Sequence, residues 1–168
     1  MNNSPQTLPE GMWTLDLAAT TVSVTVKKMK VITVAASIDV TSGSIGIADG
    51  QVASVEVIAN AASYASPNAK RNEHVVGPDF LDATAHPTIS FSAAGGDDSH
   101  RVAGAVTIKG QSTPVTFDVN DLKITDDSAS FRASATVDRF ALGIDKMPAF
   151  VIARDLDVTV TTSAKRQR

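Results

Sequence analysis

The residues that could perform chemistry in this chain are few and scattered. Histidine serves as a metal ligand or a general base, and the chain has three: His74, His86 and His100. No two of them stand at the spacing of a helical metal-ligand pair. Glu73 precedes His74, but a structural or surface role for this histidine is favoured over a metal site. The chain has no cysteine, which excludes thiol catalysis, disulfides and cysteine-ligated metals.

Motifs for nucleophilic catalysis and phosphate binding are also lacking. The Gly-Ser-Ile-Gly stretch at 43–46 does not have the strand–turn–helix context of a nucleophile elbow. The glycine-containing segment 102–110 alternates like a strand and is not a phosphate-cradling loop. We therefore expect no enzymatic activity, no metal and no cofactor.

Four charged residues stand where strands are expected to end, near a break in the strand pattern: Arg71, Asp79, Asp138 and Arg139. Charges at a barrel rim are usually paired, and we expect these to hold the rim together. The alternative is that Arg71 or Arg139 meets an anionic ligand head group. The structural role is favoured, because phosphate sites normally need several converging donors.

Composition narrows the class of partner. The net charge is -3, and acidic and basic residues are interspersed, which argues against a nucleic-acid surface and gives no strong attraction to anionic lipid head groups. No apolar run is long enough to span a bilayer. The first residues have neither a basic start nor an apolar core, so we expect no signal peptide and a cytoplasmic location.

Alternation of apolar and polar residues dominates the rest of the chain and predicts strands. The first strand is expected at Met12–Leu17, and a later one at Val31–Val40. Asp49-Gly50 between two alternating runs predicts a hairpin turn. The remaining expected strands join by short turns, without strand–helix–strand alternation. They are Thr20–Lys27, 44–48, Gln51–Ala61, Thr88–Ala94, Arg101–Lys109, Pro114–Leu122, Ala129–Val137 and Val151–Thr162.

The alternation breaks between the expected strands that end at Ala61 and begin at Thr88. Ser66-Pro67 is typical of a helix start, and His86-Pro87 ends the insert, because the residue before proline leaves helical geometry. We expect an all-β, eight-stranded antiparallel barrel with this short helical cap inserted between strands. The expected layout is a flexible leader at 1–11, the barrel at 12–164 and a basic tail at 165–168.

The inward faces of these strands are apolar but small. Aromatic residues make up only 5% of the chain, and rows of valine and alanine leave space inside an eight-stranded barrel. A flattened sandwich that packs these residues sheet on sheet is an equal alternative on periodicity alone. If the interior is a ligand cavity, we expect it to be lined by Val24, Val57, Phe80, Leu81, Phe91, Val106, Phe117, Phe131 and Ala133.

Several short motifs follow one another in a specific order and spacing. They are Trp13-Thr14-Leu15-Asp16, Arg71-Asn72-Glu73-His74-Val75, Asp79-Phe80-Leu81-Asp82, His86-Pro87-Thr88-Ile89-Ser90-Phe91, the segment 102–110 with Pro114-Val115, and Val137-Asp138-Arg139-Phe140-Ala141-Leu142-Gly143. On these motifs the chain resembles the YceI-like family, the lipocalin-like polyisoprenoid-binding proteins. The resemblance covers about Trp13 to Ala164.

The resemblance implies a long pore inside a capped eight-stranded barrel. It implies a non-catalytic role in sequestering or carrying a long isoprenoid, such as a polyprenyl phosphate or an isoprenoid quinone, and homodimers as a plausible assembly. Nucleic-acid binding and stable membrane insertion are not expected. Two other readings stay open at this point: an enzyme or modifying factor acting on an isoprenoid or apolar metabolite, and an interaction protein with a solid barrel.

Overall fold

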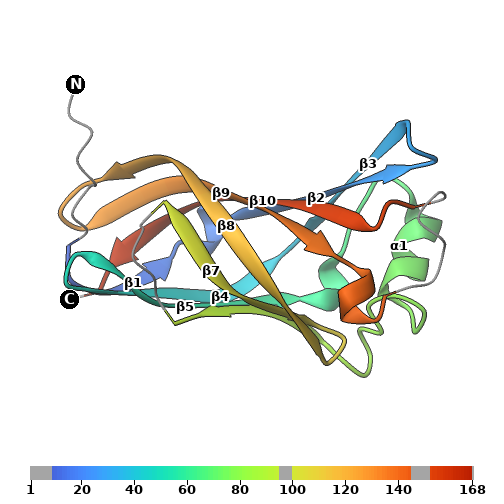
Figure 1. Ribbon diagram of the computed structural model, residues 1–168, viewed down its shortest axis with the longest axis horizontal. Coiled ribbons are helices and arrows are strands. Elements are labelled where there is room, and N and C mark those ends of the chain that lie inside the picture. Colours follow the sequence, from blue (N-terminus) through green and yellow to red (C-terminus); the bar gives the residue numbers. More distant parts are fainter. Residues whose placement is uncertain (1–8, 95–99, 145–151, 168) are drawn as a thin grey trace.

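The computed structural model describes residues 9–94, 100–144 and 152–167. Its fold is one antiparallel sheet that closes on itself (Figure 1). The strands are β1 (Gly11–Leu15), β2 (Thr21–Lys28), β3 (Ile32–Ile38), β4 (Val40–Ala48), β5 (Gln51–Asn60), β6 (Thr88–Ala93), β7 (Arg101–Ile108), β8 (Gln111–Ile124), β9 (Ser128–Asp138) and β10 (Asp155–Arg166).

Ten named strands make an eight-stranded barrel, because two long strands are each interrupted. The sheet order is β1-β4-β5-β6-β7-β8-β9-β10-β2-β3, and β1 also pairs with β10. The barrel closes because β10 pairs with β1 at 164–166 and with β2 at 157–161. The chain therefore meanders up and down with every neighbour antiparallel. The all-β, eight-stranded antiparallel barrel predicted from the sequence is confirmed.

The first interruption lies between β1 and β2 and corrects the expected strand Met12–Leu17. The strand ends at Leu15, and the 3₁₀ turn η1 (Leu17–Ala19) follows. Asp16 causes this break, because its side chain accepts a hydrogen bond from the Ala18 amide at 3.1 Å. Leu17 is consequently exposed and does not continue the inward face of Trp13 and Leu15.

The second interruption splits the expected strand Val31–Val40 into β3 and β4 at Asp39. The Asn60 amide donates to the Asp39 carbonyl at 2.9 Å, and the Asp39 amide donates to the Ser63 hydroxyl at 2.8 Å. From this point β4 stays paired with β5, whereas β3 leaves the barrel wall as the outer strand of a β2–β3 hairpin.

The hairpin turn predicted at Asp49-Gly50 is confirmed. Both residues have positive φ, 54° and 74°, as a two-residue hairpin turn between paired strands requires. The far end of the chain differs from the expectation of a tail at 165–168. Lys165 and Arg166 belong to β10 and pair with Thr14 and Trp13 of β1. The leader expected at 1–11 lies outside the described residues except for its last three.

The insert between β5 and β6 forms the expected cap at one end of the barrel (Figure 1). It contains the 3₁₀ turn η2 (Ala61–Ser63) and the helix α1 (Ala69–Val76). The helix is capped by Asn68, whose side chain accepts from the Arg71 amide at 3.0 Å, and not by Ser66 as expected. The Ser66 hydroxyl instead lies 2.7 Å from Asn72 Oδ1 and fixes the approach to the helix.

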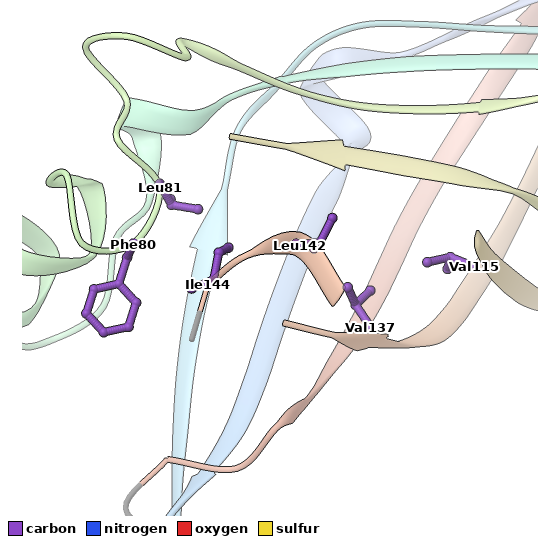
Figure 2. Packing of buried hydrophobic residues seen from close by; sticks show 6 residues of the cluster. All are labelled: Phe80, Leu81, Val115, Val137, Leu142 and Ile144. Atoms are coloured by element: carbon purple, nitrogen blue, oxygen red, sulfur yellow. The ribbon is translucent and has the colours of Figure 1, made fainter. Parts of the chain in front are cut away.

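Two hydrophobic clusters close the two ends of the barrel. Trp13, Leu15, Ile47 and Ala164 fill the end away from the cap. Figure 2 shows the cluster under the cap, which combines side chains of the insert, of β8 and β9 and of the segment after β9, namely Phe80, Leu81, Val115, Val137, Leu142 and Ile144. The segment after β9 includes the 3₁₀ turn η3 (Phe140–Leu142). None of the helices in the described ranges is long and apolar enough to cross a membrane.

Candidate functional site

The barrel interior is hollow between the two clusters. An inner chamber of about 200 Å³ begins at Trp13 and Leu15. Its wall is apolar apart from Ser90 and Thr162, and the buried Thr162 hydroxyl is within 2.7 Å of the Thr20 hydroxyl. A wall of this kind offers water almost no hydrogen-bonding partners and suits a hydrocarbon chain.

An outer chamber of about 460 Å³ continues the space towards the cap. The two chambers share wall residues from six strands, so they adjoin inside the barrel. The shared residues are Val22, Ala59, Ile89, Val106, Phe117 and Val158. Together the chambers fall within the size range of pockets that bury small organic ligands.

The nine residues expected to line a cavity all lie on the walls of these chambers. Their contact with a ligand stays a prediction. The inner chamber has Val57, Phe91, Phe131 and Ala133, the outer chamber has Val24, Phe80 and Leu81, and both chambers have Val106 and Phe117. Periodicity left a sandwich and a barrel as equal alternatives. The structure is the barrel, and it contains internal space.

Small inward side chains create this space, and leaving it empty is costly. An enclosed apolar cavity that stays empty costs about 24 cal/mol per Å³, or about 2.4 kcal/mol for each 100 Å³. The entire stability of a typical domain is about 5–15 kcal/mol. A natural apolar occupant would remove this cost and stabilise the folded state by binding to it alone.

The mouth of the outer chamber is cationic. Lys28 from β2, and Lys70, Arg71 and His74 from α1, line it, and none of the described lining residues is acidic. Sequence reasoning identified Arg71 but missed the two lysines. Lys28 could not be linked to the cap from the sequence, because 41 residues separate it from α1 and only the fold brings them to one rim.

Tyr64 stands at the same mouth, between the cations and the apolar wall. Burial raises the pKa of the Tyr64 hydroxyl above its ordinary value, and the nearby positive charge of Arg71 offsets part of this rise. The phenol is therefore neutral at physiological pH and can donate a hydrogen bond to a polar head group.

Asp79 takes a different position from the one expected for a rim or head-group residue. It is not on the chamber wall, and its carboxylate faces His74 at 4.0 Å on the same cap. Both side chains are more than half exposed, so the pair contributes little stability. The cap is instead tied to the barrel by Lys109 in the turn after β7, whose ammonium donates to the Pro78 carbonyl at 2.9 Å.

Arg139 belongs to the frame of the barrel end. It is only 2% exposed, and its guanidinium donates to the carbonyls of Ile144, Ile152 and Ala153 at 2.8–3.0 Å. It also stacks 4.6 Å from the Phe140 ring centroid. These contacts hold the turn after β9 against the start of β10. They support the structural role favoured from the sequence over the head-group role.

Catalytic groups do not converge in the described part of the chain. No group of three or more histidine, aspartate or glutamate side chains there could hold a metal ion. His74 packs edge to face on Phe80 at 5.0 Å between ring centroids, and the imidazole of His86 lies over Gly110. The geometry can hold an apolar molecule and a charged group at its end.

The closed meander and its apolar interior define a lipocalin-like barrel. The chain matches the family described as the YceI-like domain over residues 13–164. The chain therefore belongs to the YceI-like family, as its motifs predicted.

Curated relatives in sequence have the name UPF0312 protein. A UPF0312 protein of Azotobacter vinelandii is 32% identical over 78 residues, which are 44% of this chain and 41% of that protein. A UPF0312 protein of Pseudomonas putida is 30% identical over 119 residues, which are 66% of this chain and 62% of that protein. The matches thus span about two fifths to three fifths of the relatives' length.

Solved structures share the fold at low sequence identity. BcnA of Burkholderia cenocepacia superposes with a TM-score of 0.78 at 19% identity, covering 89% of this chain and 98% of that one. A polyisoprenoid-binding domain of Saccharophagus degradans, implicated in plant cell wall breakdown, superposes with a TM-score of 0.73 at 11% identity, covering 92% and 98%. At these identities the likeness establishes the fold alone.

Proposed function

We propose that this protein binds a long isoprenoid lipid inside the barrel and sequesters or carries it without chemical change. The observation that carries the proposal is the pair of adjoining, largely apolar chambers that extends from a cationic mouth to the end of the barrel at Trp13. Membership of the YceI-like family and the likeness to a polyisoprenoid-binding domain support the ligand class.

The length of the path favours a long chain. Along β10, wall residues run from Leu156 in the outer chamber to Ala164 in the inner one. This is about 26 Å at ~3.3 Å per residue, or about 20 Å along the axis of a barrel with strands tilted by ~40°. A single bilayer leaflet has about 15 Å of hydrocarbon, so the path is long enough for a chain of lipid length.

Affinity would come from burial of the chain. Each buried methylene contributes about 0.8 kcal/mol, so each added five-carbon isoprene unit that still fits would contribute up to about 4 kcal/mol, which is roughly a thousandfold in affinity. The shape of the wall, which is smooth and made of aliphatic and aromatic groups, gives little discrimination beyond length and width. Selection of the ligand would therefore depend on chain length and on the group at the mouth.

The mouth favours a polyprenyl phosphate over an uncharged isoprenoid quinone. Lys28, Lys70 and Arg71 place cationic groups from two elements around one opening, which is the convergence of donors that a phosphate needs. The neutral Tyr64 hydroxyl adds a donor at the boundary between head group and tail.

Native mass spectrometry of the purified protein tests this proposal. We expect a complex with an added mass of a polyprenyl phosphate, recovered unaltered after release. A quinone mass would correct the head group. A protein that takes up neither lipid when incubated with both would overturn the proposal, and a lipid released with altered mass would identify an enzyme. The same spectra measure whether the chain forms the homodimer that the family resemblance implies.

The contribution of the mouth is measured with a matched pair of double variants. K70Q/R71Q removes two charges at the opening, and K123Q/K165Q removes two charges from exposed positions on β8 and β10, away from the chamber walls. We expect the first pair to weaken polyprenyl phosphate binding by about tenfold or more and to leave quinone binding unchanged. Equal effects of both pairs would show that the mouth does not contact the phosphate.

A further inference from the structure

The turn of the β2–β3 hairpin exposes apolar side chains to an unusual degree. Met29 is 55% exposed, Val31 is 79% exposed and Ile32 is 52% exposed. These are half of the large hydrophobic residues that are exposed in the described chain, and they stand within four consecutive positions. Scattered single apolar residues are normal on a surface, whereas a contiguous group marks a contact site.

Lysines surround this apolar group. Lys27, Lys28 and Lys30 are all exposed, and no acidic residue occurs between Thr20 and Ile38. The hairpin is therefore locally cationic in a chain whose net charge is -3. The balanced overall charge conceals this concentration, which is why composition predicted no attraction to anionic lipid head groups.

The backbone of this turn adopts a conformation that is unfavourable for the residues in it. Met29 and Lys30 have φ of 55° and 66°, a region that costs stability for residues with a Cβ atom. Two other hairpin turns of the described chain have the same pair of positive φ values, at Asp49-Gly50 and at Lys109-Gly110, and both use glycine. Only the Met29-Lys30 turn lacks it. Methionine and lysine therefore occupy this turn at a conformational cost that glycine would avoid.

The tip lies at the mouth of the cavity. Lys28 lines the outer chamber together with Lys70 and Arg71 of α1, and Figure 1 shows the hairpin and α1 at the same end of the molecule. The base of the hairpin is held, because the Ala153 amide donates to the Lys27 carbonyl at 2.8 Å and Lys28 bridges to Ile152. The turn residues that follow Lys28 lie beyond this attachment, at the tip of the hairpin.

We propose that the hairpin tip, residues 27–32, docks on the surface of an anionic lipid bilayer. The three apolar side chains enter the interfacial region, and the lysines contact the negatively charged head groups, which is the arrangement that peripheral membrane anchors use. A docked tip places the cavity mouth against the bilayer. This inference rests on the hairpin alone and does not depend on the ligand proposed above.

The shape of the tip favours a bilayer over a protein partner. The tip is a convex turn of six residues at the end of a two-stranded hairpin. A stable protein interface needs about 800 Å² on each side, which such a tip does not supply by itself. A bilayer requires no complementary groove, because lipids rearrange around the inserted side chains.

Flotation with vesicles tests the proposal on the full chain. The vesicles are phosphatidylcholine alone, or phosphatidylcholine and phosphatidylglycerol in equal parts. We expect the protein to float with the anionic vesicles and to be released by salt, because the lysine contribution is screened. Failure to float with either kind of vesicle would overturn the proposal, as would equal flotation with both.

Two variants and two matched controls assign the binding to the tip. M29N/V31T/I32T keeps all charges. Asparagine at position 29 tolerates positive φ, and threonine at positions 31 and 32 keeps a β-branched side chain there. K27Q/K30Q removes two charges but leaves the chamber residue Lys28. The controls are I58T, which changes an exposed apolar residue of β5, and K123Q/K165Q.

The expected results separate the apolar and the charged contributions. K27Q/K30Q should weaken binding to anionic vesicles by about 25-fold, at roughly fivefold for each lysine, and M29N/V31T/I32T by about tenfold or more. The controls should bind like the wild type. Tip variants that bind like their controls while remaining folded by circular dichroism would overturn the proposal. Uptake of polyprenyl phosphate supplied without vesicles should be unchanged in M29N/V31T/I32T, so this result and the ligand proposal can fail independently.

Discussion

Phe91 and Phe117 meet edge to face where the two chambers join, with ring centroids 4.9 Å apart and ring planes at 81°. Phe117 lines both chambers, and Phe91 lines the inner one. Gly104 makes the position of Phe91 feasible, because a Cβ atom there would lie 2.8 Å from Phe91 Cζ. The pair therefore lies on the wall beside any ligand that reaches from one chamber into the other.

A charge at this pair is expected to expel the ligand. In F91D a carboxylate would face an apolar chamber, and burying it beside a hydrocarbon chain is unfavourable. We expect lipid in the purified variant to fall to a small fraction of the wild-type amount, measured by mass spectrometry of extracted lipid. The same reasoning holds for F131D on the wall of the inner chamber. Folded variants that retain their lipid would contradict the placement of the ligand.

Arg139 is expected to matter for stability more than for binding. R139L leaves the carbonyls of Ile144, Ile152 and Ala153 without their buried donor. Each buried carbonyl left without a donor costs about 1–3 kcal/mol, so we expect a loss of about 3 kcal/mol or more, which urea denaturation measures. R132L, at an exposed position of the same strand β9, is the control and should change stability by less than about 0.5 kcal/mol. Equal effects of R139L and R132L would contradict the structural role.

R139K tests whether geometry or charge matters at this site. A lysine ammonium keeps the charge but lacks the planar fork that reaches several carbonyls from one position. We expect R139K to recover only a small part of the stability lost in R139L. Full recovery would show that a single buried charge is sufficient.

Much of this fold follows from the sequence because alternation and turn chemistry are local properties. The strands, the Asp49-Gly50 turn and the cap insert each have a signal within a few residues. The mouth does not, because Lys28 and Lys70 come together only when the barrel closes. The partners of Arg139 are main-chain carbonyls, which no side-chain pattern reveals. Sequence therefore predicted which residues face inwards better than which charges share a rim.

Asp138 and Arg154 make the barrel end sensitive to pH. The hydrogen bond from Arg154 to Asp138, 2.7 Å long, lowers the pKa of the Asp138 carboxyl, and a bond from the Phe140 amide acts in the same direction. Because the pKa is lower in the folded state, the carboxylate stabilises the fold above the ordinary aspartate pKa. This contribution is lost as the pH falls through the folded-state pKa.

The D138N variant measures this effect. At neutral pH we expect it to unfold at lower urea concentration than the wild type. The difference should shrink below the ordinary aspartate pKa and disappear as the pH falls through the lower folded-state pKa. In an R154Q background the same substitution should have a smaller effect, because the main partner of the carboxylate is gone. A difference that does not change with pH, or one that R154Q leaves intact, would contradict the assignment.

The fluorescence of Trp13 is expected to report how far a ligand reaches. It is the chain's single tryptophan, it is 3% exposed, and it lines the closed end of the inner chamber. A polyprenyl phosphate long enough to fill the path of about 20 Å would contact the indole and change its emission. A short-chain prenyl phosphate with the same head group would occupy the outer chamber and leave the emission unchanged, although mass spectrometry would still detect its binding. The change should begin only at a chain length that reaches Trp13, since the tail meets this residue after it passes Phe91 and Phe117. An emission change with the short ligand, or none with the long one, would contradict a tail that runs inwards from the mouth.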